Sequence, residues 1–251
     1  MTAKRLIARL DIKGPNVVRG IHLEGLRVVG QPEEMAARYA EAGIDELIFI
    51  DTVATLYGRN NTLAVVERTA EKVFVPLTVG GGIRELKDVD AVLRAGADKV
   101  SVNSAAVRRP EFVTEIAKSF GSQCVVATIE AKRQGPAWTV VIENAREATG
   151  KDVLQWAKEV VERGAGEICL TSIDEDGMKR GCDLALVRAV SQAVRVPVIA
   201  SGGPGKPEHA VDALQAGADA VALGTLLHFK LATVADVKQA MSRAGVETRA
   251  R

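Results

Sequence analysis

Two similar stretches of sequence determine the fold of this chain. The first is VPLTVGGGIRELKDVDAVLRAGADKVSVNSAAV, from Val75 to Val107. The second is VPVIASGGPGKPEHAVDALQAGADAVALGTLLHF, from Val196 to Phe229. Each begins with a short apolar run, passes through a glycine-rich turn and a stretch of helical periodicity, and ends in a second apolar run. This order predicts a strand–helix–strand unit in each stretch.

The two stretches also show that the chain repeats itself. Gly82 corresponds to Gly203 at an offset of 121 residues (203 − 82), which is about half of the 251-residue chain. A repeat of that length predicts two half-barrels, approximately 1–122 and 123–251, within a single domain over 1–251.

The rest of the chain continues the same alternation. Strands are predicted at Arg5–Leu10, Glu46–Ile50, Val75–Val79, Lys99–Val102, Cys124–Ile129, Glu167–Leu170, Val196–Ala200 and Ala220–Leu223. Helices are predicted near 32–42, 60–73, 86–94, 110–118, 151–163, 184–193, 207–216 and 234–244. The strands are apolar throughout, which a sheet buried on both faces requires. Eight such pairs favour a closed (β/α)₈ TIM barrel.

Composition excludes several classes of protein. The 33 basic and 32 acidic side chains nearly cancel, whereas a nucleic-acid-binding protein needs a basic excess or a basic face. No apolar run approaches the roughly 18 residues of a membrane helix, and the charged N-terminus does not resemble a signal peptide. The three scattered cysteines and three histidines lack metal-ligand spacing. We therefore expect a cytoplasmic protein without metal or cofactor.

Two glycine-rich turns predict phosphate sites, because glycine lets backbone N–H groups approach an anion closely. The residues are Gly81, Gly82, Asn103 and Ser104 in the first half, and Ser201, Gly202, Gly203, Gly224 and Thr225 in the second. One such turn could serve packing alone, but two related copies favour a ligand with a phosphate at each end. Asp176 and Gly177 are either part of this site or a plain turn, and Tyr57–Asn60 either touches substrate or is only solvated.

Two carboxylates end corresponding strands. Asp11 follows the first strand and Glu130 the fifth, so we expect them to face each other across the barrel mouth. Such a pair suits general acid–base catalysis if the environments separate the two pKa values. The alternative is that each carboxylate only pairs with a neighbouring cation, such as Arg9 or Lys132.

The segments KRLIARLDIK, AGIDELIFID, PLTVGGGI, AGADKVSVNSAAV, GAGEICLTSIDEDG and PVIASGGPGK resemble the cyclase subunits of imidazole glycerol phosphate synthase. The resemblance covers nearly the whole chain. It implies a lyase of histidine biosynthesis that forms a heterodimer with a glutaminase subunit. Ammonia from that partner attacks an amidine-linked bis-phosphoribosyl substrate. The products are imidazole glycerol phosphate and aminoimidazole carboxamide ribotide.

The resemblance also assigns residues. Asp11 matches one catalytic aspartate, and the second position holds Glu130, where the family usually has aspartate. Four charged residues, Arg5, Glu46, Lys99 and Glu167, match a gate of the ammonia path at the barrel floor. Asp98 and Gln123 match residues at the glutaminase interface. Without the resemblance, the four charges would indicate only a stabilising salt-bridge cluster.

Departures from the family cluster at the mouth, where Arg9 replaces a cysteine and Arg19 replaces a lysine. They resemble paralogues in surface-sugar pathways, which leaves a glutamine-dependent enzyme that installs nitrogen on an activated nucleotide sugar as an alternative. A second alternative is a non-catalytic barrel that activates its glutaminase. The isomerase of the preceding pathway step shares the fold, but it needs no ammonia, and the floor cluster argues against it.

Overall fold

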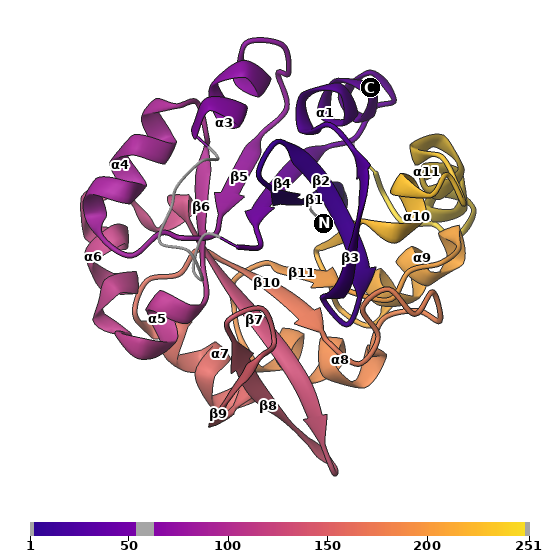
Figure 1. Cartoon of the computed structure of the whole chain (residues 1–251). Helices are drawn as coiled ribbons and strands as arrows, with labels where there is room; N and C mark the ends of the chain where they lie inside the picture. The colour runs from indigo at the N-terminus through magenta and orange to yellow at the C-terminus, as the bar shows by residue number, and fades with distance from the viewer. Residues whose placement is uncertain (1–2, 54–62, 249–251) are drawn as a thin grey trace.

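The computed structural model describes residues 3–53 and 63–248, and these form a closed barrel of parallel strands inside a ring of helices (Figure 1). The barrel order is β1 (Arg5–Lys13), β4 (Glu46–Asp51), β5 (Leu77–Gly80), β6 (Lys99–Val102), β7 (Val125–Gln134), β10 (Glu167–Ser172), β11 (Val198–Ser201) and β12 (Ala220–Leu223). β12 pairs with β1 and closes the barrel. All eight strand predictions are confirmed, and so is the TIM barrel. The segment Tyr57–Asn60 lies outside the described residues.

The helices occupy the predicted places. The longer ones are α1 (Pro32–Glu41), α3 (Leu63–Ala70), α4 (Leu86–Arg94), α6 (Glu111–Phe120), α7 (Val153–Glu162), α8 (Leu184–Ala193), α9 (Pro207–Gln215) and α11 (Val234–Arg243). Two short helices, α5 (Ser104–Arg108) and α10 (Thr225–His228), follow β6 and β12, and a 3₁₀ turn spans Ser122–Cys124. No helix in the described part of the chain is long and apolar enough to cross a membrane.

The repeated Ala-Gly-Ala-Asp motif has a structural explanation. Gly96 and Gly217 follow α4 and α9 with φ of +108° and +118°, a conformation that only glycine adopts readily. The aspartates that close the motif then tie down the preceding strands. Asp98 accepts a hydrogen bond from the Leu77 amide at 2.8 Å, and Asp219 accepts one from the Val198 amide at 3.1 Å.

Most of the buried apolar side chains form two layers. The larger lies between the strands and the helices, and it includes Phe49, Phe112 and Ile116, which are fully buried. The smaller fills the barrel interior with Ile7, Ile48, Val126, Cys169, Ile199, Ala220 and Ala222. Because strand side chains alternate between the two faces, the polar residues of the mouth continue the interior rows of this second layer.

Two antiparallel hairpins extend the barrel, and the sequence analysis predicts no strand in either. β2 (Asn16–Ile21) and β3 (Glu24–Gly30) build onto β1, while β8 (Ala137–Ile142) and β9 (Glu147–Asp152) build onto β7. Figure 1 shows β8 and β9 protruding from the ring of helices and β2 and β3 lying over the barrel. The two hairpins begin at the strands that carry Asp11 and Glu130, so they set the walls of the mouth.

Candidate active site

Asp11 lies at the end of β1 and is almost completely buried, with 2% of its surface exposed. Both carboxylate oxygens accept hydrogen bonds from arginines: Oδ1 from Arg9 Nε at 2.9 Å, and Oδ2 from Arg19 Nη1 at 2.7 Å. Burial alone would raise the pKa of Asp11, but the two guanidinium groups outweigh it and hold the pKa below its ordinary value. Asp11 is therefore a fixed anion at neutral pH.

Arg9 and Arg19 reach across the mouth from β1 and β2. Arg9 Nη1 donates to the hydroxyls of Thr171 at 2.9 Å and Ser201 at 3.2 Å. Arg19 donates to Asp176 and, through Nε, to the Thr225 hydroxyl at 3.0 Å. Buried charges are stable only when paired and hydrogen-bonded, and this network pairs two cations with two anions. Arg9 and Arg19 therefore lie at the centre of the mouth.

Glu130 at the end of the barrel portion of β7 has a different environment. It is 7% exposed, and its Oε2 accepts one hydrogen bond, from the Ala145 amide at 3.1 Å. Burial raises the pKa of Glu130 to about 7, although the charge of Arg9 and the Ala145 hydrogen bond lower it. The negative charges of Asp11 and Asp176 add to the increase. One carboxyl of the mouth is thus held as an anion, and the other titrates near neutrality.

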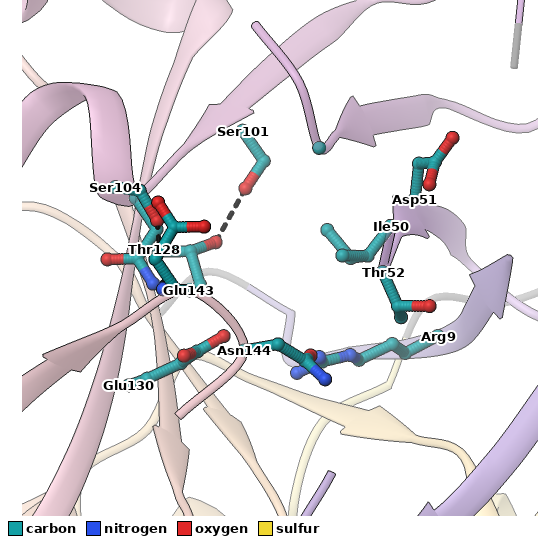
Figure 2. Close-up of a pocket in the computed structure, with 12 residues that line it drawn as sticks. Arg9, Ile50, Asp51, Thr52, Ser101, Ser104, Thr128, Glu130, Glu143 and Asn144 are labelled. Atoms are coloured by element: carbon teal, nitrogen blue, oxygen red, sulfur yellow. Dashed lines mark hydrogen bonds between the residues drawn. The ribbon is translucent and has the colours of Figure 1, made fainter. Parts of the chain in front are cut away.

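Three of the four first-half phosphate residues, Gly81, Asn103 and Ser104, line a small cavity together with Glu130 and Arg9, while Gly82 follows in the turn after β5 with φ +75°. The cavity has a volume of about 60 Å³ and is lined by Arg9, Ile50, Asp51, Thr52, Gly81, Ser101, Asn103, Ser104, Thr128, Glu130, Glu143 and Asn144. Figure 2 shows Glu130 and the guanidinium of Arg9 entering it from opposite sides. Gly81 has φ +96°, and a Cβ there would lie 2.3 Å from the Asp51 carbonyl oxygen, so only glycine fits. Among the described residues, the buried Asn103 Oδ1 has no hydrogen-bond partner.

Three of the five second-half phosphate residues are in contact with the arginines. Ser201 accepts from Arg9, Thr225 accepts from Arg19, and the Arg19 guanidinium lies against Gly224. Gly203 has φ +113°, and a Cβ there would meet the Gly181 carbonyl oxygen at 1.9 Å. The two halves therefore differ in their contacts with cations, because Arg9 and Arg19 both donate to the second half, which also borders a cavity of about 360 Å³ lined by Arg19, Gly177 and Thr225 among others.

Asp176 and Gly177 lie beside the second half, on the loop after β10. Asp176 is 1% exposed and pairs with Arg19. The Gly177 backbone, with φ +77°, is so close to β2 that a Cβ would lie 2.6 Å from the Gly20 carbonyl oxygen. Both residues hold β2 against the mouth.

The turns of the two hairpins meet over the mouth. Leu23 packs with Val141, Ile173 and Ala145, and Asn144 Nδ2 donates to the Leu23 carbonyl at 3.1 Å. Three consecutive residues, Glu143 to Ala145, have φ between 55° and 63°. Left-handed backbone costs a non-glycine residue about 1–2 kcal/mol, so this turn is held by its surroundings. Sequence analysis missed it because no glycine marks these positions.

Sequence reasoning also missed the role of His228. This buried histidine donates from Nε2 to the Arg9 carbonyl at 2.9 Å, so its Nδ1 accepts from the Tyr39 hydroxyl at 2.7 Å. Burial lowers the pKa of His228 to about 4, which keeps the ring neutral. The pair fixes the backbone of β1 where Arg9 turns into the barrel.

At the opposite end of the barrel, the four charged residues of the predicted gate come together. Arg5 donates to Glu46 at 2.8 Å and to Glu167, while Lys99 Nζ lies 2.8 Å from Glu167 and 3.4 Å from Glu46. They border an outer cavity of about 470 Å³ that Gln123 also lines. We call these four residues the floor cluster. In the described part of the chain, no group of three or more histidine, cysteine or acidic side chains could hold a metal ion.

Comparison with known proteins supplies the relatives of this chain. Residues 5–233 match the family model described as "Histidine biosynthesis protein". The chain is 58% identical over 209 residues to imidazole glycerol phosphate synthase subunit HisF of Legionella pneumophila, which covers 83% of this chain and 99% of that relative. It is 51% identical to the subunit HisF of Myxococcus xanthus (strain DK1622) over 250 residues, or 99% of each chain. It is also 51% identical to that of Bacillus cereus (strain ATCC 10987 / NRS 248) over 251 residues, or 99% of this chain and 100% of the relative.

Proposed function

The chain belongs to the histidine biosynthesis protein family, among the HisF subunits of imidazole glycerol phosphate synthase, and we propose how its residues perform the cyclase reaction. The cyclase joins ammonia to an amidine-linked bis-phosphoribosyl substrate. It releases imidazole glycerol phosphate and aminoimidazole carboxamide ribotide. The observation that carries the proposal is the pair of unlike carboxyl groups at the mouth, above a floor cluster of paired charges.

The two carboxyl groups take opposite roles. The incoming nitrogen must lose protons as it joins the imidazole ring, and the departing amine must gain one. Glu130, which is protonated below a pH of about 7, is the acid that protonates the leaving amine, and the carboxylate that remains then accepts a proton that the incoming nitrogen loses. Asp11 stays ionised, and it orients and stabilises the positive charge that develops on the reacting nitrogen. Environments that push two pKa values apart are the usual way in which one site provides both functions.

The glycine-rich turns hold the two phosphates of the substrate. On the first side, the backbone at Gly81 and Gly82 and the side chains of Asn103 and Ser104 surround one phosphate. On the second side, the Ser201–Gly203 turn and Thr225 take the other, with Arg19 as a guanidinium donor beside it. The cavity of about 60 Å³ is too small for this substrate, since ligand sites usually measure ~300 Å³ or more. The second side borders a larger cavity of about 360 Å³, lined by Arg19, Gly177 and Thr225 among others, which gives room for the other end of the substrate.

Ammonia enters from the floor. We assign the outer cavity to the interface with a glutaminase subunit, because Gln123 lines it and the floor cluster closes the barrel beneath it. Asp98 stabilises that edge through its hydrogen bond to Leu77. The chain then works as one half of a cytoplasmic heterodimer, and its single domain consists of two half-barrels that each contribute one carboxylate and one phosphate turn.

Charge reversal at Lys99 tests the ammonia path. Lys99→Glu places a third acid against Glu46 and Glu167, and like charges in contact cost several kcal/mol. We expect glutamine-dependent turnover of the complex to fall about tenfold or more. An increase of 1.4 kcal/mol in the free energy needed for ammonia to pass the floor cluster already lowers turnover by a factor of ten. Turnover with free ammonium, which enters at the mouth, is expected to change much less.

The matched control is Lys158→Glu, because Lys158 is exposed on α7 and the reversal changes the net charge equally. It should leave both activities unchanged. Equal losses of glutamine-dependent and ammonium-dependent turnover in Lys99→Glu would show that the floor cluster only stabilises the barrel.

A further inference from the structure

The cavity of about 360 Å³ beside the second-half phosphate residues has a lysine in its wall. Thr225 and the buried Arg19 line it on the barrel side, and Lys179 and the ring of Phe229 line it farther out. Ligand sites usually measure ~300 Å³ or more, so this cavity can take one phosphorylated end of a substrate. Lys179 is the residue of this wall that the proposed function has not yet used.

The backbone around Lys179 is attached to the second-half phosphate turn. The Gly181 N–H donates to the Gly203 carbonyl at 3.0 Å, which joins the end of the loop after β10 to that turn. Gly205 lies so close to Lys179 that a Cβ added to Gly205 would collide with the Lys179 backbone. The loop therefore places Lys179 beside the turn that binds the second phosphate.

Lys179 has an unfavourable backbone conformation. Its φ is +63°, in the left-handed region, where a side chain with a Cβ is strained and glycine is not. Residues held in such conformations gather at ligand-binding sites, because the surrounding structure must enforce them. A lysine where glycine would fit better indicates that the side chain itself has a use.

The ammonium group of Lys179 has no anion beside it. Nζ lies 5.6 Å from the centroid of the Phe229 ring, and among the described residues this ring is the only partner of the ammonium group. A contact between a cation and an aromatic ring at an exposed site is weak, and a charge-assisted hydrogen bond to phosphate is stronger. The long, flexible lysine side chain can exchange one for the other.

The other charges that line the cavity are balanced. Arg19 is paired with two buried aspartates. Arg27 and Glu24, both exposed on β3, carry opposite charges. Lys179 is the remaining cation, so the cavity has a net positive charge that attracts an anion.

We propose that Lys179 is a clamp for one phosphate of the substrate, which leaves the Phe229 ring and binds the phosphate at the second-half turn. The proposal rests on the proposed function, which provides the phosphate at that turn. Lys179 binds substrate and transition state alike, because the phosphate it holds does not react. Loss of such an interaction raises KM and leaves kcat almost unchanged.

The first test is Lys179→Gly, assayed as turnover of the bis-phosphate substrate with saturating ammonium. Glycine adopts the left-handed backbone without strain, so the variant removes the ammonium group and keeps the loop. We expect KM to rise about tenfold, which is typical for the loss of one hydrogen bond to a charged group, and the melting temperature to be kept. Lys179→Met, which keeps the length of the side chain, should show the same rise, and Lys179→Arg should reverse most of it.

Lys230→Gly is the matched control. Lys230 is also exposed and also left-handed, with φ +54°, but it lines a different cavity. Its replacement changes the net charge equally and should leave KM and kcat unchanged.

The second test uses the two products as inhibitors, because each of them keeps one of the two phosphates. Lys179→Gly should weaken inhibition by one product about tenfold and leave inhibition by the other unchanged.

Three results would overturn the clamp. An unchanged KM in Lys179→Gly and Lys179→Met would mean that the ammonium group does not reach the phosphate. Equal weakening of inhibition by both products, or the same rise of KM in Lys230→Gly, would mean that only the net charge matters. A fall in kcat together with the melting temperature would mean that Lys179 is structural. Failure of the proposed function is distinguishable, because the wild type would then form no imidazole product even with free ammonium.

Discussion

Replacing Asp11 with asparagine is expected to abolish cyclase turnover. Asparagine keeps the shape of the side chain but removes the charge that two arginines share. General acid–base and electrostatic groups of this kind contribute about 10²- to 10⁴-fold in rate. The measurement is turnover of the bis-phosphate substrate with saturating ammonium, together with a thermal unfolding curve. The curve is needed because leaving buried guanidinium groups without their anion costs about 3–5 kcal/mol.

Asp176→Asn is the matched comparison. Asp176 is equally buried, and it pairs with the same Arg19. Its replacement should lower stability to a similar degree, yet slow turnover far less, because Asp176 is hydrogen-bonded to Arg19 and not to Arg9, whereas Asp11 is hydrogen-bonded to both. If Asp11→Asn and Asp176→Asn lose activity in proportion to stability alone, Asp11 has a structural role and not a catalytic one.

Replacing Glu130 with glutamine is expected to slow the reaction by about 10²- to 10⁴-fold, because an amide cannot supply a proton. The wild-type rate should also report the ionisation of Glu130. Its pKa is raised to about 7, so the acid is present below pH 7 and is lost as the pH rises through that value. The rate at a constant concentration of free ammonia should therefore fall above pH 7.

Glu130→Asp provides the control for geometry. It keeps a carboxyl group but shortens the side chain by one methylene, and a misplacement of about 1 Å can cost on the order of 100-fold. This variant should be slow but keep a pH-dependent rate, whereas Glu130→Gln should lose the dependence. A wild-type rate that rises through pH 7 at constant free ammonia would make Glu130 the base instead.

The barrel itself could be predicted because its signals are local. Apolar runs and helical periodicity located all eight barrel strands, two of them, Lys99–Val102 and Ala220–Leu223, to the residue. The hairpins could not be found by the same signals. β3 and β9 are largely exposed, so no apolar run marks them, and the Glu143–Ala145 turn is held by contacts with distant residues.

The residues of the candidate site could be predicted from the sequence, but the hydrogen bonds between them could not. Asp11, Glu130 and the glycine turns follow from strand ends, whereas the network around Asp11 depends on β2 folding back over the mouth. One signal could have located Arg9. It lies two residues from both Ile7 and Asp11 on β1, so strand alternation places all three on the interior face. The roles of Arg9 and Arg19 at the mouth can be inferred only when their hydrogen-bond partners are known from the structure.

The most direct test of the central claim is turnover of the bis-phosphate histidine intermediate by this chain alone, with saturating ammonium and no partner. A spectrophotometer can follow it, since substrate and products absorb differently. The account predicts steady formation of imidazole glycerol phosphate, which would support Glu130 as the acid of the reaction. Tight binding without turnover would contradict the acid–base assignment and favour a barrel that only activates its glutaminase. The absence of both binding and turnover would contradict the cyclase itself and favour an activated sugar as the acceptor of the nitrogen.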